Sequence, residues 1–340
     1  MSSQEITVRP FQPGDEEGLL VLFNEVFGED NARHKARTRE QWKWEFLDNP
    51  AGTQVVVGVE PSGRMVAQYA CLPARVNLRG EDVCCGQGID SVVHRDYRRG
   101  LKREGAFLKV ARYYFEHFGR KEINAFGYGF PNKKAYRIGV RMLDYVPVAA
   151  PVKALYRNLF NYKRDDEVGE GAATEGEILE LSRFDERVDL LWERLRPDLK
   201  MAIQRTSTYL NWRYSDCPSV NYLSFGLTDE SGGLRAVWVT RANWMGPPIL
   251  AVTELIVGNK DRGAIARALA HCVGLARSTG QPRVELWIPP TSPIYDCVLG
   301  QGFQVENSYA NLCIKIYDES LGASWARANW FYTIGDSDVF

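Results

Sequence analysis

The stretch that decides the fold is DVCCGQGIDSVVHRDYRRGLKREGAF, residues 82–107. Its first part, residues 82–93, predicts a strand that runs directly into a basic turn, residues 94–105. From residue 106 to residue 118, apolar side chains recur at the spacing of a helix that packs on a sheet. A further strand is expected within residues 122–131. Because a helix connects the two strands, they are expected to pair in parallel.

The second half of the chain repeats this order of elements. Paired strands, a turn into an amphipathic helix, a strand and a short helix ending in Gly-Phe are expected at residues 235–257, 258–277, 283–290 and 292–303. These similarities predict two copies of one α/β fold. Chance similarity between two mixed α/β patterns is the alternative.

Composition and charge exclude several classes of protein. The 340 residues are 45% hydrophobic and 25% charged, which is typical of a globular chain rather than of a disordered or fibrous one. A net charge of −1 provides no overall basic field, so neither nucleic acid nor a membrane is expected as a partner. Seven cysteines without a Cys-x-x-Cys pair and four scattered histidines predict neither disulfides nor a metal site. No signal peptide is recognisable, so a cytoplasmic location is expected.

An acidic stretch suggests where the domains meet. Residues 165–186 contain nine acidic residues and one basic residue, as a solvated linker does. We expect an N-terminal domain at 1–160, a linker at 161–182, a C-terminal domain at 183–318 and an aromatic tail docked on the body at 319–340. An acidic loop inside a single domain is the alternative.

The basic turn has the chemistry of an anion site. Between His94 and Lys121 there are nine Lys or Arg residues and three acidic ones, although the whole protein is nearly neutral. Most of the cations precede a helix N-terminus, whose free N–H groups also favour an anion. Gly100 and Gly105 allow close approach of the backbone, so a phosphate or pyrophosphate is the expected ligand. A solvated basic loop is the alternative. The motifs of Walker loops, dinucleotide folds and serine hydrolases are absent from the sequence.

These residues resemble the GNAT superfamily of acetyl-CoA-dependent N-acyltransferases. The resemblance rests on the strand around VVHRDY, the turn Lys102–Phe107, the helix after it, the strand GYGFP and the segment that starts at Asn132. It implies two tandem GNAT-like domains, each a mixed, mostly antiparallel twisted sheet with flanking helices. It also implies a splayed parallel strand pair at the cofactor cleft. The family's loop pattern is Arg/Gln-x-x-Gly-x-Gly/Ala, and Phe107 departs from it at the third marked place.

The resemblance assigns acetyl-CoA as the co-substrate and marks residues that would bind it. Backbone groups of Ser91, Val92 and Val93 would face the pantetheine arm, and Asn132 would lie near the thioester. The pyrophosphate would be wrapped by the turn and the residues beside it: Arg98, Arg99, Lys102, Arg103, Glu104, Gly105, Ala106 and Phe107. No metal is implied.

Acetyl transfer to an amine needs a base for the ammonium proton and an acid for the leaving thiolate. Asp90, on the strand that faces the cleft, is the candidate base, although a structural strand-end carboxylate is the more common role. Tyr136 is the candidate acid by resemblance, although in many members the tyrosine lies seven residues after the asparagine and not four. Tyr128, on the preceding strand, is the substitute. Core packing is the alternative for both tyrosines.

The expected function is therefore acyl transfer from acetyl-CoA to a primary amine of a small molecule or peptide. The turn Gly258–Gly263 has fewer cations and matches the loop pattern poorly, so the second copy is expected to be degenerate. A non-catalytic acyl-CoA-binding protein and an acyl carrier protein-dependent transferase of longer chains are the alternatives. Acids of the tail, Asp336 and Asp338, or the terminal carboxylate could supply a base, but simple packing of the tail is the more common outcome. The oligomeric state is left open.

Overall fold

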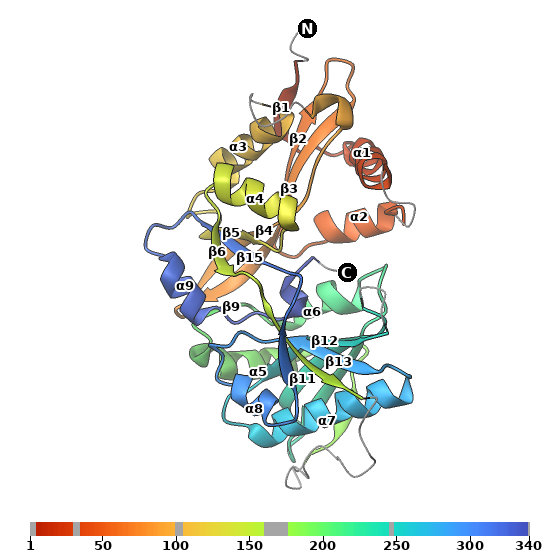
Figure 1. The fold of residues 1–340 in the computed structure, drawn as a ribbon, viewed down its shortest axis with the longest axis vertical. Helices are drawn as coiled ribbons and strands as arrows, with labels where there is room; N and C mark the ends of the chain where they lie inside the picture. The colour runs from red at the N-terminus through yellow and green to blue at the C-terminus, as the bar shows by residue number, and fades with distance from the viewer. Residues whose placement is uncertain (1–4, 30–34, 99–104, 160–175, 245–247, 339–340) are drawn as a thin grey trace. The chain divides into compact units, whose positions relative to one another are not determined.

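The structure is a computed structural model that describes residues 5–29, 35–98, 105–159, 176–244 and 248–338. It contains two mixed, mostly antiparallel β-sheets with flanking helices, and each sheet includes one parallel strand pair (Figure 1). This confirms the expected fold class. Within the described residues, no helix combines the length and apolar character that a bilayer crossing needs.

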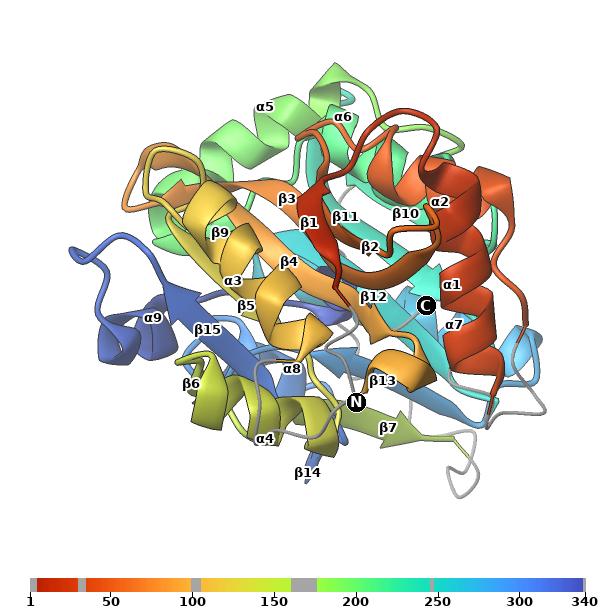
Figure 2. The same ribbon diagram turned by 90° about the horizontal axis from the view of Figure 1, so that it is seen from above.

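The first sheet has the strand order β1-β2-β3-β4-β5-β15-β6, and β9 pairs with the end of β3. Its strands are β1 (Thr7–Pro10), β2 (Gln54–Val59), β3 (Met65–Leu78), β4 (Glu81–Val93), β5 (Phe126–Gly129), β6 (Val146–Ala149), β9 (Met201–Ile203) and β15 (Leu312–Ile316). Both ribbon views place α1 (Glu16–Gly28) and α2 (Arg39–Phe46) on one face of β1–β4 and α3 (Ala106–Phe118) on the other (Figures 1 and 2).

Local sequence explains these helices. Thr38 caps α2 by accepting a hydrogen bond from the Gln41 N–H at 3.2 Å. Ala106, Val110, Ala111 and Tyr114 of the predicted apolar stripe of α3 are buried, and the Tyr114 hydroxyl donates to Gln54 Oε1 on β2 at 2.6 Å. The short helix η1 (Arg95–Tyr97) follows β4 directly. The strand and the helix predicted from residues 82–118 are therefore present as β4 and α3, and part of the predicted turn forms η1, whereas residues 99–104 of that turn lie outside the described residues.

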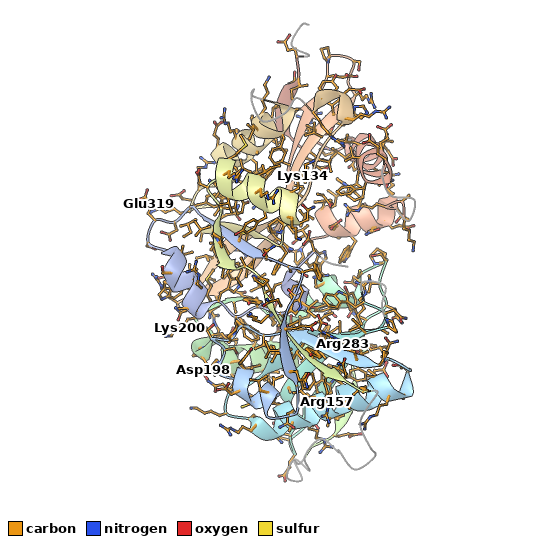
Figure 3. All side chains as sticks on the ribbon, in the orientation of Figure 1. Lys134, Arg157, Asp198, Lys200, Arg283 and Glu319 are labelled. Atoms are coloured by element: carbon orange, nitrogen blue, oxygen red, sulfur yellow. The ribbon has the colours of Figure 1, made fainter. Side chains whose placement is uncertain are left out.

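The second sheet has the order β14-β7-β13-β12-β11-β10-β8. Its strands are β7 (Lys153–Asn158), β8 (Ile178–Glu180), β10 (Leu223–Thr228), β11 (Leu234–Arg241), β12 (Leu250–Val257), β13 (Arg283–Trp287) and β14 (Gln304–Asn307). Arg157 and Arg283, labelled in Figure 3, lie on the neighbouring strands β7 and β13. Small residues let α7 (Arg262–Ser278) pack closely, since Ala264, Ala268 and Ala276 are all fully buried.

The remaining helices are short. They are α4 (Lys133–Met142), α5 (Glu186–Leu195), η2 (Arg196–Asp198), α6 (Ser207–Leu210), η3 (Asn211–Ser215), α8 (Tyr295–Leu299), α9 (Ala323–Asn329) and η4 (Ile334–Asp336). Asn132 caps α4, and Asp185 caps α5.

The chain divides into two compact units. The first unit comprises Met1–Arg75, Val83–Gly129 and Ile314–Leu321, and the second comprises Val76–Asp82, Phe130–Cys313 and Gly322–Phe340. These bounds differ from the domain ends expected at residues 160 and 183, because each expected domain contributes a strand to the sheet of the other. From the expected N-terminal domain, β7 pairs with β13, and from the expected C-terminal domain, β15 takes the place beside β5. The expected linker also contains β8, although most of that linker lies outside the described residues.

Candidate functional site

The parallel strands β4 and β5 separate at the end of a short ladder. Their pairing runs from Cys85 opposite Phe126 to Gln87 opposite Tyr128, and β4 then continues alone on this side to Val93. At Asp90 the strand takes a φ of 44°, and the Gln68 side chain donates to the Asp90 carbonyl at 3.0 Å. Such a break leaves backbone groups of β4 open to a ligand on the side facing β5.

The predicted pantetheine-facing residues lie on this open part of β4. Val92 and Val93 are buried, whereas Ser91 is exposed and its hydroxyl donates to the Ile89 carbonyl at 3.4 Å. The Val93 carbonyl accepts a hydrogen bond from Arg98 Nε at 2.8 Å. In this state the Val93 carbonyl is therefore occupied by Arg98.

The N-terminus of α3 follows the basic turn. Gly105 is the capping residue and has no side chain to bond the first N–H groups, and no acidic side chain stands in the first turn. Ala106 is buried, and the half-buried Phe107 ring lies 6.1 Å from the Tyr69 ring. This helix end therefore favours an anion. The predicted phosphate ligands Arg99, Lys102, Arg103 and Glu104 lie outside the described residues.

Asp90 is engaged by an arginine that the sequence did not single out. One guanidinium nitrogen of Arg37, Nη1, bonds Asp90 Oδ2 and also lies 3.1 Å from Glu45 Oε2. Only 13% of the Asp90 side chain is exposed, and only 2% of that of Glu45. In the sequence, Glu45 stands among Trp42, Trp44 and Phe46. This aromatic surrounding was the one sequence signal that could have identified Glu45 as a buried carboxylate.

The two candidate acids differ in accessibility. Tyr128 on β5 is 1% exposed, and its hydroxyl donates to Gln87 Oε1 on β4 at 3.2 Å. Tyr136 is half-buried on α4, in the second unit. Asn132 is exposed, and its Oδ1 accepts from the N–H groups of Lys134, labelled in Figure 3, and Ala135, each at 3.0 Å. The side-chain oxygen of Asn132 therefore caps the N-terminus of α4.

A further reactive group of the first unit, the Cys71 thiol, is buried on β3. Burial raises the pKa of the Cys71 thiol to about 12, so this thiol is protonated at neutral pH. Among the residues that the structure describes, no cluster of His, Cys, Asp and Glu could hold a metal ion. A polar pocket of about 530 Å³ lies between the β1–α1 and β2–β3 turns, where Arg9 forms a two-pronged ion pair with Asp15 at 2.6 and 2.8 Å.

The second unit has the same strand arrangement, but its own chain occupies the opening. Pairing of β12 with β13 ends at Val252 opposite Leu286, and the next residue, Thr253, lies against the C-terminal segment 333–337. A Cβ atom added at Gly335 would lie 2.9 Å from the Thr253 carbonyl oxygen and 2.0 Å from the Tyr214 hydroxyl oxygen. Only a glycine fits this contact.

Buried charges hold that segment in place. Arg205 lies 2.6 Å from Asp336 and 3.2 Å from Glu254 of β12, and none of the three side chains is more than 1% exposed. Arg213 donates to the carbonyls of Gly335 and Ser337. Burial raises the pKa of the Glu254 carboxyl, an effect that Arg205 opposes. Because Asp336 is buried against Arg205, it is not available as a base, and the terminal carboxylate lies outside the described residues.

Comparisons with known proteins agree with this architecture. Residues 7–137 match the family model described as an acetyltransferase (GNAT) domain. A probable N-acyltransferase from Enterococcus faecalis shares the fold with a TM-score of 0.65 at 12% identity, over 92% of this chain and 73% of that one. Saccharomyces cerevisiae N-myristoyltransferase with bound myristoyl-CoA gives a TM-score of 0.59 at 13% identity, over 94% and 83%.

A third structure, a GCN5-related N-acetyltransferase from Anabaena variabilis, gives a TM-score of 0.63 at 11% identity, over 92% of this chain and 73% of that one. A search of curated proteins found no match. The family match to residues 7–137 and the two similar sheets define the class of the fold as a GNAT-like domain followed by a second sheet of the same kind. Residues 7–137 thus match a GNAT acetyltransferase domain, and the chain as a whole shares the two-sheet fold of these structures, as the resemblance seen in the sequence predicted.

Proposed function

We propose that this protein is an acyl-CoA-dependent N-acyltransferase whose catalytic cleft lies in the first unit, where β4 separates from β5. The observation that carries the proposal is the coincidence of three features within residues 85–106. The parallel ladder stops at Gln87, β4 continues beyond that ladder to Val93, and α3 begins at Ala106 with no side chain capping its N-terminus. An open strand edge suits the amides of pantetheine, and the helix end suits its pyrophosphate.

The second unit lacks the same opening, which favours a single cofactor site. The segment around Gly335 packs against Thr253, the first residue beyond the β12–β13 ladder. In addition, Asp261 caps α7 by accepting from the Ala264 N–H at 3.0 Å, so the corresponding helix end already has a carboxylate. A second anion there would meet like charge.

The proposed reaction is direct attack without a covalent enzyme intermediate. The neutral amine nitrogen bonds to the thioester carbon, the carbon–sulfur bond breaks, the base takes the amine proton and the acid protonates the departing thiolate. Asp90 is the proposed base, directly or through a water. Tyr136 is the proposed acid by family resemblance, and Tyr128 on β5 of the first unit is its substitute. Acetyl-CoA is the proposed donor, and the proposed acceptor is a primary amine of a small molecule or peptide.

A longer acyl chain is the second candidate. The observation in its favour is the fold shared with yeast N-myristoyltransferase, whose structure contains myristoyl-CoA. Acyl length depends on the depth of the cleft beyond the thioester, and the two donors share the pantetheine and pyrophosphate contacts. Acetyl-CoA and the longer-chain donor can therefore be compared in the same assay, and the donor that is used shows which acyl length the cleft accepts.

The test is a thiol-release assay with mass-spectrometric detection of the product. Acetyl-CoA and myristoyl-CoA are each offered with cadaverine, tryptamine, glucosamine and a lysine-containing peptide. Release of CoA with a matching mass gain on one amine is expected, and Asp90→Asn should reduce the rate by about 100-fold or more. Glu40→Gln, an exposed carboxylate on α2, is the matched control. Binding of acyl-CoA without transfer to any amine would favour the non-catalytic alternative.

A further inference from the structure

Arg37 links two carboxylates that come from distant parts of the first unit. Its Nη1 atom bonds Asp90 on β4, 53 residues away in sequence, and lies 3.1 Å from Glu45 on α2. Glu45 is the more deeply buried partner, with 2% of its side chain exposed against 13% for Asp90. The guanidinium therefore connects a deeply buried carboxylate to the one at the open strand.

The position of Arg37 is determined by three further contacts with two residues of α1, Asn24 and Phe23. Its backbone N–H donates to Asn24 Oδ1 at 2.8 Å, and its carbonyl accepts from Asn24 Nδ2 at 3.2 Å. Its guanidinium carbon lies 3.8 Å from the centre of the Phe23 ring. A stacked and hydrogen-bonded arginine has few alternative rotamers, so it can hold a partner in one geometry.

Asp90 needs such a partner because its strand does not orient it. Regular strands direct side chains alternately to the two faces, but the φ of 44° at Asp90 breaks that alternation. Gln68 donates to the backbone carbonyl of Asp90 and so fixes the backbone at this residue. The direction of the Asp90 carboxylate is then set by Arg37. A base must lie within about 3 Å of the proton that it accepts, so its direction affects the rate.

We propose that Arg37, anchored by Glu45, is a positioning residue that sets the direction of the Asp90 carboxylate for proton removal from the acceptor amine. The proposal rests on the proposed function. Arg37 acts through Asp90 and is not itself a catalytic residue. It follows that replacing Arg37 lowers kcat, that lysine in its place restores part of the rate, and that affinity for acyl-CoA does not change.

A double-mutant cycle in kcat tests this role, with acetyl-CoA and whichever amine of the four-member panel is acylated fastest. Arg37→Met is expected to reduce kcat by about tenfold or more, and Arg37→Lys by less. In the Asp90→Asn background, Arg37→Met should cause no further loss, because there is no carboxylate left to orient. Arg39→Met is the matched control, since the Arg39 side chain is 74% exposed and its ion pair with Glu17 lies at the surface.

Each outcome is decisive. Independent, multiplicative losses for Arg37→Met and Asp90→Asn would overturn the proposal and indicate a structural role for Arg37. Equal losses for Arg37→Met and Arg37→Lys with a matching fall in melting temperature would do the same. Wild-type protein that acylates no amine would instead overturn the proposed function, and the positioning role with it. Glu45→Gln gives an independent check, since it should lower kcat only where Asp90 is present.

Discussion

The ion pair between Arg9 and Asp15 joins β1 to the start of α1. Partial burial alone would raise the pKa of the Asp15 carboxyl, but hydrogen bonds from Arg9 and from the Gln12 N–H outweigh it and hold that pKa below its usual value. A carboxyl with a lowered folded-state pKa stabilises the fold above its unfolded-state pKa. That contribution disappears as the pH falls through the folded-state value.

Asp15→Asn is therefore expected to reduce the free energy of unfolding by about 1 kcal/mol at pH 7. The difference from wild type should begin to shrink below about pH 4, the usual pKa of an aspartate, and should vanish only below the lowered folded-state pKa, where the folded wild-type carboxyl is protonated as well. Urea unfolding at several pH values measures it. Glu17→Gln, a surface change in the same helix, is the control, and a deficit for Asp15→Asn that does not shrink as the pH is lowered from about 7 to about 2.5 would contradict the explanation.

The two tyrosines predict different consequences of losing a hydroxyl. Tyr136→Phe should reduce kcat by about 100-fold with unchanged affinity for CoA, since Tyr136 is the proposed acid. Tyr128→Phe should act on stability, because its hydroxyl is buried and bonded to Gln87. Steady-state kinetics paired with thermal melting separates the two effects. The reverse pattern would transfer the acid role to Tyr128.

At the residue scale, sequence patterns predicted the strand on which a side chain lies better than the residue that it contacts. Asp90 and Tyr128 could be located on their strands, because alternation and helix spacing are local properties. The pairing of Asp90 with Arg37 spans 53 residues, and local patterns carry no information about such distances. The use of Asn132 as the cap of α4 was readable in principle, since asparagine before a helix is a common cap.

Among the elements, the segment around η4 is the one whose packing tolerates least change. Gly335→Ala would place a Cβ atom 2.0 Å from the Tyr214 hydroxyl oxygen, so it should lower the free energy of unfolding by about 1–3 kcal/mol. Adding Tyr214→Phe removes that oxygen and should recover part of the loss. The backbone carbonyl of Thr253, 2.9 Å away, limits the recovery.

Thermal melting of the single and double variants measures this coupling. Gly322→Ala is the matched control, because nothing lies within 4 Å of a Cβ atom there. A melting temperature of Gly335→Ala equal to that of the control would mean that segment 333–337 does not pack against β12 as described.

Helices and strands themselves were predictable to the extent that their patterns are local. The strand, turn and helix of residues 82–118 follow from apolar spacing and from the glycines of the turn. The aromatic composition of the tail indicated packing, but not that Asp336 would pair with Arg205, because the two residues lie 131 positions apart. Buried ion pairs of this kind leave little local signature, since a charged residue usually indicates a surface.

At the scale of the whole molecule, the exchange of strands makes the two halves of the sequence interdependent. A fragment of residues 1–160 would lack β15, which lies beside β5, and would carry β7 without β13. Both β5 and β7 would then expose unpaired edges. We expect this fragment to be aggregated or unfolded by circular dichroism, and co-expression with residues 161–340 to recover a folded complex. A monomeric fragment with cooperative melting would show that the halves fold independently.

The strand exchange also marks the limit of sequence reasoning about the fold. Two similar patterns predicted two similar sheets, and two are present. However, neither sequence pattern determines which of the two sheets its last strands join. The partner of a strand depends on packing between residues that are far apart in sequence. The expected ends at residues 160 and 183 followed from composition, which does not register this choice.

The most direct test of the account is calorimetric titration of CoA into the intact protein. We expect one site per chain, and we expect Lys102→Ala combined with Arg103→Ala to weaken CoA by about tenfold or more, because both cations precede the N-terminus of α3. Lys109→Ala, on the exposed side of α3, should leave the affinity unchanged. Unaltered affinity in the double variant with its fold intact would contradict a CoA site at the β4–α3 junction.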